Sequence, residues 1–154
     1  MFRKQNGKTG VTLKIAGFGD RHIKTLLADY DGTLSCQGEV TEQIKERLAR
    51  LAERIDIHIL TADRKAKSNG CFGRLPVTIK ILSGDDQDVQ KRECLRGLVP
   101  ANVAVFGNGN NDRLLLEAVK SNGGLCVAIS NGEGCAAPLR LESFPEQFRT
   151  GGSA

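Results

Sequence analysis

The stretch LLADYDGTLS, residues 26–35, decides how this chain folds and where its chemistry lies. It opens with an apolar run and then places two carboxylates, Asp29 and Asp31, directly before Gly32 and Thr33. A short apolar run that ends in turn residues is typical of a buried strand in a parallel sheet. Side chains two apart on a strand face the same way, so we expect both carboxylates on one face of the strand's carboxyl end.

Paired carboxylates at a strand end suit phosphoryl transfer. Their oxygens can bind Mg²⁺, which prefers oxygen ligands and keeps open positions for phosphate oxygens. Asp29 can attack phosphorus and form an aspartyl-phosphate, while Asp31 handles the proton of the leaving group and then of water. Gly32 lets the backbone turn sharply beside the anion. The alternative is a plain turn after a strand, since Asp and Gly are the commonest turn residues.

Strand and helix patterns alternate along the chain. Residues 11–18 and 23–30 are β-prone runs separated by Gly19 and Asp20, and they form either a hairpin or two successive strands. An amphipathic helix is predicted from Thr41 to Arg54, with Thr41 as its N-cap. Further strands are predicted at 55–63, 77–82, 103–106 and 125–129, and helices at 87–98 and 112–120, with room for one helical turn after residue 63. Little periodicity remains past Ile129, so we expect the strand at 125–129 to be the last.

This alternation predicts an α/β three-layer sandwich, in which helices cover both faces of a central parallel sheet. Ligands of such open sheets bind at the carboxyl ends of the strands. At 154 residues the chain fits a single domain, expected to span residues 1–154 with a core at about 11–135 and a poorly defined C-terminal tail.

The composition excludes several classes of protein. With 40% hydrophobic and 26% charged residues, the chain is typical of soluble globular proteins. The net charge of +4 is spread along the chain without a nucleic-acid motif, so we expect no nucleic-acid partner. No apolar run approaches the roughly 18 residues that cross a bilayer, so we expect no membrane partner and a cytoplasmic location. Five scattered cysteines, never spaced CxxC, predict free thiols.

The pentapeptide DYDGT, residues 29–33, resembles the DxDGT signature that opens the haloacid dehalogenase (HAD) superfamily of phosphatases and P-type ATPases. The resemblance implies three further motifs, which follow in the expected order. Thr61, with Ala62 beside it, matches the hydroxyl residue that donates a hydrogen bond to the transferring phosphoryl group. Lys91 best matches the lysine ahead of the next strand, whose ammonium offsets the repulsion between Asp29 and a phosphate dianion.

The last motif, GNGNND at residues 107–112, resembles the GDGxND loop of phosphoserine phosphatases and P-type ATPases. Asn111 and Asp112 match its final two positions. Asn108 stands where the superfamily has an aspartate that ligates magnesium, so the site loses one negative charge and should bind the ion more weakly. TAD at 61–63 and GEG at 132–134 are similar to a small group of soluble P-type ATPase-like proteins. The resemblance covers roughly residues 11–135.

The spacing of these motifs leaves no room for a cap domain. Only 27 residues separate Thr33 from Thr61, and 29 separate Thr61 from Lys91. Core elements use both gaps, so we expect a capless protein with an open site. Such a site can admit a large substrate or be covered by a second copy of the chain, and it lacks the water exclusion that closure provides.

The resemblance therefore implies a Mg²⁺-dependent phosphatase that acts on a phosphorylated substrate through an aspartyl-phosphate on Asp29. An alternative is a weakly active or inactive regulatory protein that binds phosphate or a phosphorylated partner, suggested by Asn108. A receiver-like phospho-acceptor domain is a third, which the DxDGT order and the Gly-Asn loop disfavour. The predicted site comprises the catalytic residues Asp29, Asp31, Thr61 and Lys91, the phosphate-binding residues Gly32, Thr33, Thr61, Ala62, Lys91 and Asn111, and the metal ligands Asp29, Asp31 through its main-chain carbonyl, Asn108 and Asp112.

Overall fold

A computed structural model describes residues 7–35, 39–64, 72–73, 75–107, 112–130 and 139–142 of the chain. Its strands are β1 (Val11–Ile15), β2 (Gly19–Ile23), β3 (Thr25–Asp29), β4 (Asp56–Thr61), β5 (Thr78–Ile81), β6 (Val103–Gly107), β7 (Leu125–Ser130) and β8 (Leu139–Glu142). Its helices are α1 (Glu42–Ala52), α3 (Gln87–Glu93) and α4 (Arg113–Ser121), with a 3₁₀ turn, η1, at Pro100–Asn102.

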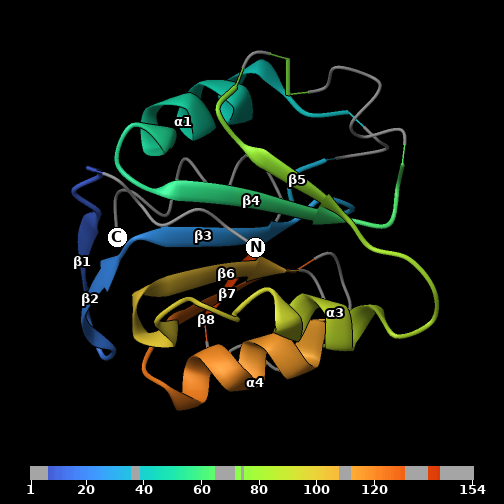
Figure 1. The fold of residues 1–154 in the computed structure, drawn as a ribbon. Helices are drawn as coiled ribbons and strands as arrows, with labels where there is room; N and C mark the ends of the chain where they lie inside the picture. Colours follow the sequence, from blue (N-terminus) through green and yellow to red (C-terminus); the bar gives the residue numbers. More distant parts are fainter. Residues whose placement is uncertain are drawn as a thin grey trace.

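The central sheet is parallel and has helices on both faces, as the alternation of patterns predicts. Six strands follow the order β5-β4-β3-β6-β7-β8, and each neighbouring pair is parallel. Helix α1 lies over one face, and helices α3 and α4 lie over the other (Figure 1). The three-layer α/β sandwich is confirmed.

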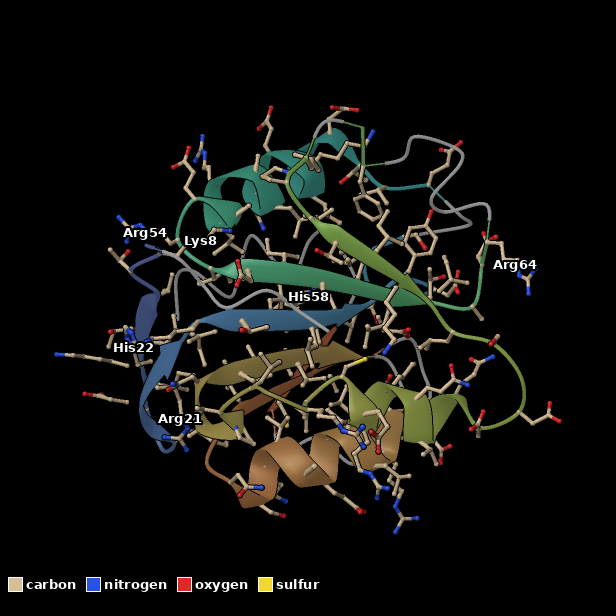
Figure 2. The ribbon with its side chains drawn as sticks, in the orientation of Figure 1. Lys8, Arg21, His22, Arg54, His58 and Arg64 are labelled. Atoms are coloured by element: carbon tan, nitrogen blue, oxygen red, sulfur yellow. The ribbon has the colours of Figure 1, made fainter. Side chains whose placement is uncertain are left out.

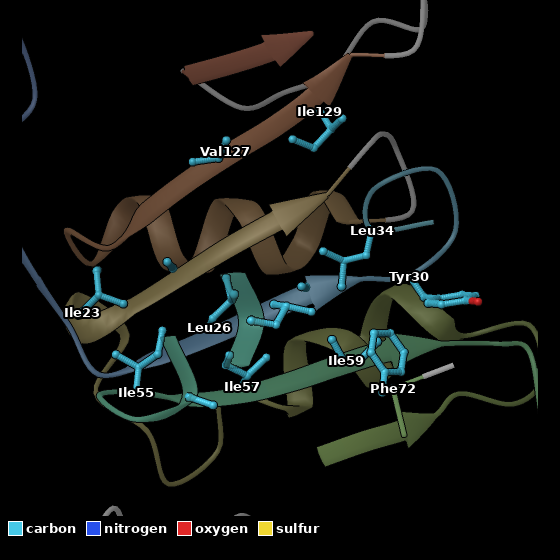
Figure 3. Packing of buried hydrophobic residues seen from close by; sticks show 14 of the residues in the cluster. Ile23, Leu26, Tyr30, Leu34, Ile55, Ile57, Ile59, Phe72, Val127 and Ile129 are labelled. Atoms are coloured by element: carbon cyan, nitrogen blue, oxygen red, sulfur yellow. The ribbon is translucent and has the colours of Figure 1, made fainter. Parts of the chain in front are cut away.

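Both faces of the sheet are buried, so its strands carry continuous apolar runs rather than alternating ones. Successive residues of β3 enter opposite cores: Leu26 belongs to the cluster under α1 and Leu27 to the cluster under α3 and α4. Ile57 and Ile59 of β4 pack in the first cluster (Figure 3). The carboxyl ends of these strands are thus fixed by packing on two sides.

Helix α1 begins where the capping pattern predicts. The Ile44 amide donates to Thr41 Oγ1 at 3.3 Å, which satisfies one of the free amides of the first turn. Leu48 and Ala52 are buried on the face toward the sheet. The helix therefore covers the strands that lead into the predicted site.

The N-terminal strands break at a different place from the one predicted. Gly19 and Asp20 are not the linker: they open β2, which pairs with β1 as an antiparallel hairpin, and Lys14 lies opposite Asp20. The turn falls earlier, where the Phe18 amide donates to the Ile15 carbonyl at 2.9 Å. Gly17 has a φ of 82°, which favours glycine and allows this tight turn.

Two predicted boundaries also shift. Helix α3 ends at Glu93 rather than continuing to residue 98, because the chain goes on in i to i+3 turns as far as Gly97, whose φ is 83°. Helix α4 begins at Arg113, with Asp112 in the N-cap position.

The strand at 125–129 is not the last one. Strand β8 pairs in parallel with β7 at the edge of the sheet. Its four residues are too few to give a recognisable periodic pattern. The prediction that residues 125–129 form the last strand is therefore wrong.

The structure also bears on the predictions about the membrane and the cysteines. In the part of the chain that the structure describes, no helix is long and apolar enough to cross a bilayer. Cys94 and Cys126 are buried free thiols, and burial raises the pKa of Cys126 to about 11. Cys36, Cys71 and Cys135 lie outside the described residues.

His58 of β4 should make the fold sensitive to acid. Burial, reinforced by Lys8 and Lys80 and opposed by Asp56, lowers its pKa from 6.5 to about 4. The unfolded chain then takes up this proton at higher pH than the folded chain, so stability is lost as the pH falls from about 6.5 to about 4. We expect a loss of about 3 kcal/mol in the free energy of unfolding from this one group.

Denaturant unfolding at pH 7 and pH 4 measures this loss. His58→Gln should remove about 3 kcal/mol of the difference between the two pH values. His22→Gln is the matched control, because His22 is exposed on β2 and should leave the difference unchanged. Equal acid sensitivity in the wild type and in His58→Gln would contradict the prediction.

Candidate active site

Strand β3 delivers Asp29 to the carboxyl edge of the sheet, and a tight turn follows it. The Tyr30 carbonyl accepts hydrogen bonds from the Leu34 amide at 3.1 Å and from the Ser35 amide and hydroxyl, both at 3.0 Å. Gly32 adopts a φ of 73°, a conformation that side chains disfavour. The turn predicted from Asp and Gly is therefore real, and it carries the first motif.

The two carboxylates of this motif differ in their surroundings. The Asp29 side chain is 12% exposed, whereas Asp31 is exposed to solvent. Asp31 lies past the end of β3, in an isolated bridge to Ser35, so the two residues are not both strand residues as predicted. Asp31 is still close enough for its charge to act on Asp29.

Tyr30 anchors the turn from the opposite side. Its side chain is buried, and its ring meets Phe72 edge-to-face at 5.8 Å between centroids (Figure 3). The Tyr30 amide also donates to the Leu60 carbonyl of β4 at 3.0 Å. The turn after β3 is thus tied to the neighbouring strand.

Lys91 and Asp112 join Asp29 in one buried group. The Lys91 ammonium lies 2.6 Å from Asp112 Oδ1 and 3.2 Å from Asp29 Oδ1. Lys91 and Asp112 are only 3% and 2% exposed. Residues from β3, α3 and the start of α4, distant in sequence, therefore converge on a single cation.

The approach of Asp112 depends on Gly107 at the end of β6. A methyl group on Gly107 would lie 2.5 Å from Asp112 Oδ2, closer than real contacts allow. Glycine at this position therefore leaves space for the carboxylate to fold back toward Lys91. The other two predicted members of this loop, Asn108 and Asn111, lie outside the described residues.

The charges of this group shift its pKa values. Burial raises the pKa of Asp29 from 3.8 to about 7, the Asp112 and Asp31 carboxylates push the same way, and Lys91 opposes them. Burial alone would lower the pKa of Lys91, but Asp29 and Asp112 outweigh it and leave the pKa raised. Lys91 is therefore charged, and the raised pKa of Asp29 means that its carboxyl loses its proton at a higher pH than an ordinary aspartate.

Two hydroxyls lie on the motifs predicted to bind phosphate. Thr61 ends β4, is buried, and accepts a hydrogen bond from the Asp63 amide at 3.0 Å. Thr33 Oγ1 is buried and has no hydrogen-bond partner among the described residues. Ala62 is exposed beside Thr61. These positions agree with the predicted edge of the sheet, while a role in binding phosphate stays a prediction.

The residues present fit a divalent cation. Two carboxylates share one ammonium, so the group keeps an excess of negative charge. Asp112 Oδ2 is buried and finds no hydrogen-bond partner within the described ranges, an unusual state for a carboxylate oxygen. The described residues hold no cluster of three or more His, Cys, Asp or Glu side chains placed for a metal. A site here would therefore need main-chain or amide oxygens, such as the predicted Asp31 carbonyl and Asn108.

The sequence did not predict the direct ion pair of Lys91 with Asp112, because Lys91 was predicted to bind phosphate and Asp112 to bind the metal. It also missed Gln90, whose side chain bonds to the loop after β5. A half-buried Gln directly before a site lysine carries no motif. Only contact geometry distinguishes it from a surface residue.

The three-layer α/β fold resembles that of a solved structure. A crystal structure of a protein named as a HAD family hydrolase, from Streptomyces avermitilis, superposes with a TM-score of 0.50 over 70% of this chain and 67% of its own, at 18% identity. At that identity the similarity establishes the fold. No protein-family model matches the chain.

A second similarity lies in sequence. An uncharacterized protein of Methanocaldococcus jannaschii is 47% identical over 38 residues, which are 25% of this chain and 86% of the archaeal protein. By this match the chain belongs to the family of that archaeal protein, whose name assigns no activity.

Proposed function

We propose that this chain is a Mg²⁺-dependent phosphomonoester hydrolase in which Asp29 is the nucleophile. The observation that carries the proposal is the placement of the Lys91 ammonium between Asp29 Oδ1 and Asp112 Oδ1, at 3.2 and 2.6 Å, at the carboxyl edge of the parallel sheet. A buried carboxylate beside a fixed cation is suited to approach by an anionic phosphate.

The side chains supply the steps of the reaction. Asp29 attacks phosphorus, so that a bond forms to its carboxylate oxygen and the bond to the leaving oxygen breaks. Asp31, which is exposed beside the turn, gives its proton to the leaving oxygen. Asp31 then takes a proton from a water molecule that attacks the same phosphorus, and this second step releases phosphate and frees Asp29.

Lys91 and Thr61 stabilise the charge of the transferring group. Lys91 offers an ammonium that two carboxylates hold in place, and Thr61 offers a hydroxyl at the end of β4. Asp29, Asp112, Asn108 and the Asp31 carbonyl would hold Mg²⁺. When bound, the ion neutralises charge on the phosphoryl oxygens and favours the ionised form of Asp29.

Hydrolysis of p-nitrophenyl phosphate with Mg²⁺, and with a chelator, tests the proposal. We expect turnover that needs Mg²⁺ and is lost on chelation. Asn108→Asp should bind Mg²⁺ about tenfold more tightly, because it restores a carboxylate ligand. Turnover that survives complete chelation would contradict the metal requirement.

A second candidate function is the binding of phosphate or a phosphorylated partner without turnover, which Asn108 favours. Phosphate binding with no hydrolysis, even in Asn108→Asp, would select it over the phosphatase. Unchanged Mg²⁺ affinity in Asn108→Asp would remove its main support.

A further inference from the structure

The Gln90 side chain makes three hydrogen bonds to one loop, one as an acceptor and two as a donor. Its Oε1 accepts from the Ser83 amide at 3.2 Å, and its Nε2 donates to the Ser83 carbonyl and to Asp86 Oδ1, the latter at 2.7 Å. The paired bonds to the Ser83 amide and carbonyl resemble those of a neighbouring strand. Gln90 therefore closes the loop between β5 and α3 onto the helix that carries Lys91.

This loop is itself joined to the strand that carries Thr61. The amide of Leu82, the residue before Ser83, donates to the Thr61 carbonyl at 2.8 Å. The loop runs at the carboxyl ends of the strands, between β5 and α3 (Figure 1). Two hydrogen bonds and the peptide bond between Leu82 and Ser83 thus connect Thr61 to Gln90, the residue next to Lys91.

Helix α3 depends on contacts outside the helix for its stability. It has seven residues, and helices this short are not stable alone in water. Its N-cap residue, Asp86, makes no capping hydrogen bond with its side chain, and its carboxylate accepts from Gln90 instead. Lys91 lies on this helix, so the direction from which its ammonium reaches Asp29 and Asp112 depends on where the backbone of α3 lies.

We propose that Gln90 is a positioning residue for the candidate active site. It holds α3 against the loop that follows β5, which is bonded to the end of β4, and so fixes the distance between the Lys91 ammonium and the hydroxyl of Thr61. This inference rests on the proposed function, in which both groups act on one phosphoryl group. Loss of the Gln90 contacts should let α3 move. This movement should lower the affinity for phosphate, although every group that contacts phosphate is still present.

Gln87 gives a matched control on the same helix. It is three residues away and makes one bond to the loop, from Nε2 to the Gly84 carbonyl at 3.3 Å. It does not bond to Ser83, and it is a glutamine of similar exposure. Comparison of the two alanine variants separates positioning through Ser83 from general disturbance of the helix.

Binding of inorganic phosphate with Mg²⁺, measured by calorimetry, and kcat for p-nitrophenyl phosphate test the inference. Gln90→Ala should weaken phosphate binding and lower kcat by about tenfold each, and Gln87→Ala should change either by less than about twofold. In a Lys91→Met background, Gln90→Ala should change phosphate affinity by less than about twofold, because the group it positions is gone.

Gln90→Glu tests whether the donor bonds of the amide are needed. An ionised glutamate cannot donate to the Ser83 carbonyl or Asp86, but a protonated one can. Its kcat relative to wild type should therefore rise as the pH falls from 7 to 5. A flat ratio would contradict a role for the amide donor.

The outcomes separate this inference from the proposed function. Normal phosphate binding and turnover in Gln90→Ala would overturn the inference alone, as would an equal loss of affinity in the Lys91→Met background. Phosphate binding without turnover in the wild type would contradict hydrolysis, while the affinity series would still test Gln90. A wild type that neither binds phosphate nor hydrolyses the ester would overturn both.

Discussion

Replacing Asp29 with asparagine is expected to lower Mg²⁺-dependent kcat by at least about a thousandfold. An amide cannot act as the nucleophile, although its shape preserves most of the local packing. Asp29, at the end of β3, also places its Oδ1 at 3.2 Å from the Lys91 ammonium. Steady-state hydrolysis of p-nitrophenyl phosphate measures the loss.

Asp56→Asn is the matched control for this variant. Asp56 opens β4 at the opposite end of the strand from Thr61, and its carboxylate pairs with Lys8 at 3.0 Å. Figure 2 shows Lys8 at the end of the molecule away from Arg64, which follows the Thr61 motif. If Asp56→Asn keeps the wild-type kcat while Asp29→Asn retains only residual turnover, the result supports Asp29 as the nucleophile. More than about a tenth of wild-type kcat in Asp29→Asn would exclude it.

Replacing Lys91 with methionine should affect both activity and stability. We expect kcat to fall by about a hundredfold or more, because a fixed cation beside the reacting phosphate is lost. At pH 8 the free energy of unfolding should fall by about 3 kcal/mol, because Asp29 and Asp112 are left buried without a counter-charge. Denaturant unfolding without added metal measures the second effect.

The stability penalty should depend on pH in a defined direction. Burial and Asp112 already raise the pKa of Asp29 to about 7, and loss of Lys91 raises it further. A carboxyl whose folded pKa exceeds its unfolded value destabilises the fold as the pH rises above the unfolded value. The penalty of Lys91→Met should therefore be smaller at pH 5 than at pH 8.

Lys45→Met controls for loss of a lysine in general. Lys45 pairs with Glu42 at 3.1 Å on α1, where the Glu42 side chain is 84% exposed. Exposed pairs of this kind contribute little, so its effect should stay below about 0.5 kcal/mol. A Lys91→Met penalty no larger than that of Lys45→Met, or one independent of pH, would contradict a buried charge cluster.

The regular part of the fold could be predicted from the sequence because its signals are local. Thr41 caps a helix with an apolar face, and the runs before Asp29 and Thr61 are apolar on both sides of the sheet. The hairpin turn at Gly17 and the edge strand β8 escaped prediction because each depends on pairing between short segments. Pairing partners are not encoded in the periodicity of one segment.

The candidate site was likewise predicted only in part. The motifs placed Asp29, Thr61, Lys91 and Asp112 at one edge of the sheet, which follows from the rule for parallel strands. The sequence did not show that Lys91 bridges two carboxylates, or that Gly107 leaves the space for Asp112, because both depend on distances across the fold. The different exposure of Asp29 and Asp31 likewise depends on where β3 ends.

The central claim is that Asp29 carries the phosphoryl group during turnover. Its most direct test is mass spectrometry of the protein quenched in acid within milliseconds of mixing with substrate and Mg²⁺, followed by borohydride reduction to mark any acyl phosphate. A phosphoryl mass on the peptide that contains Asp29, converted by borohydride to homoserine at that position, is the predicted result. Steady turnover with no adduct on Asp29, or with the phosphoryl group on another residue, would contradict it.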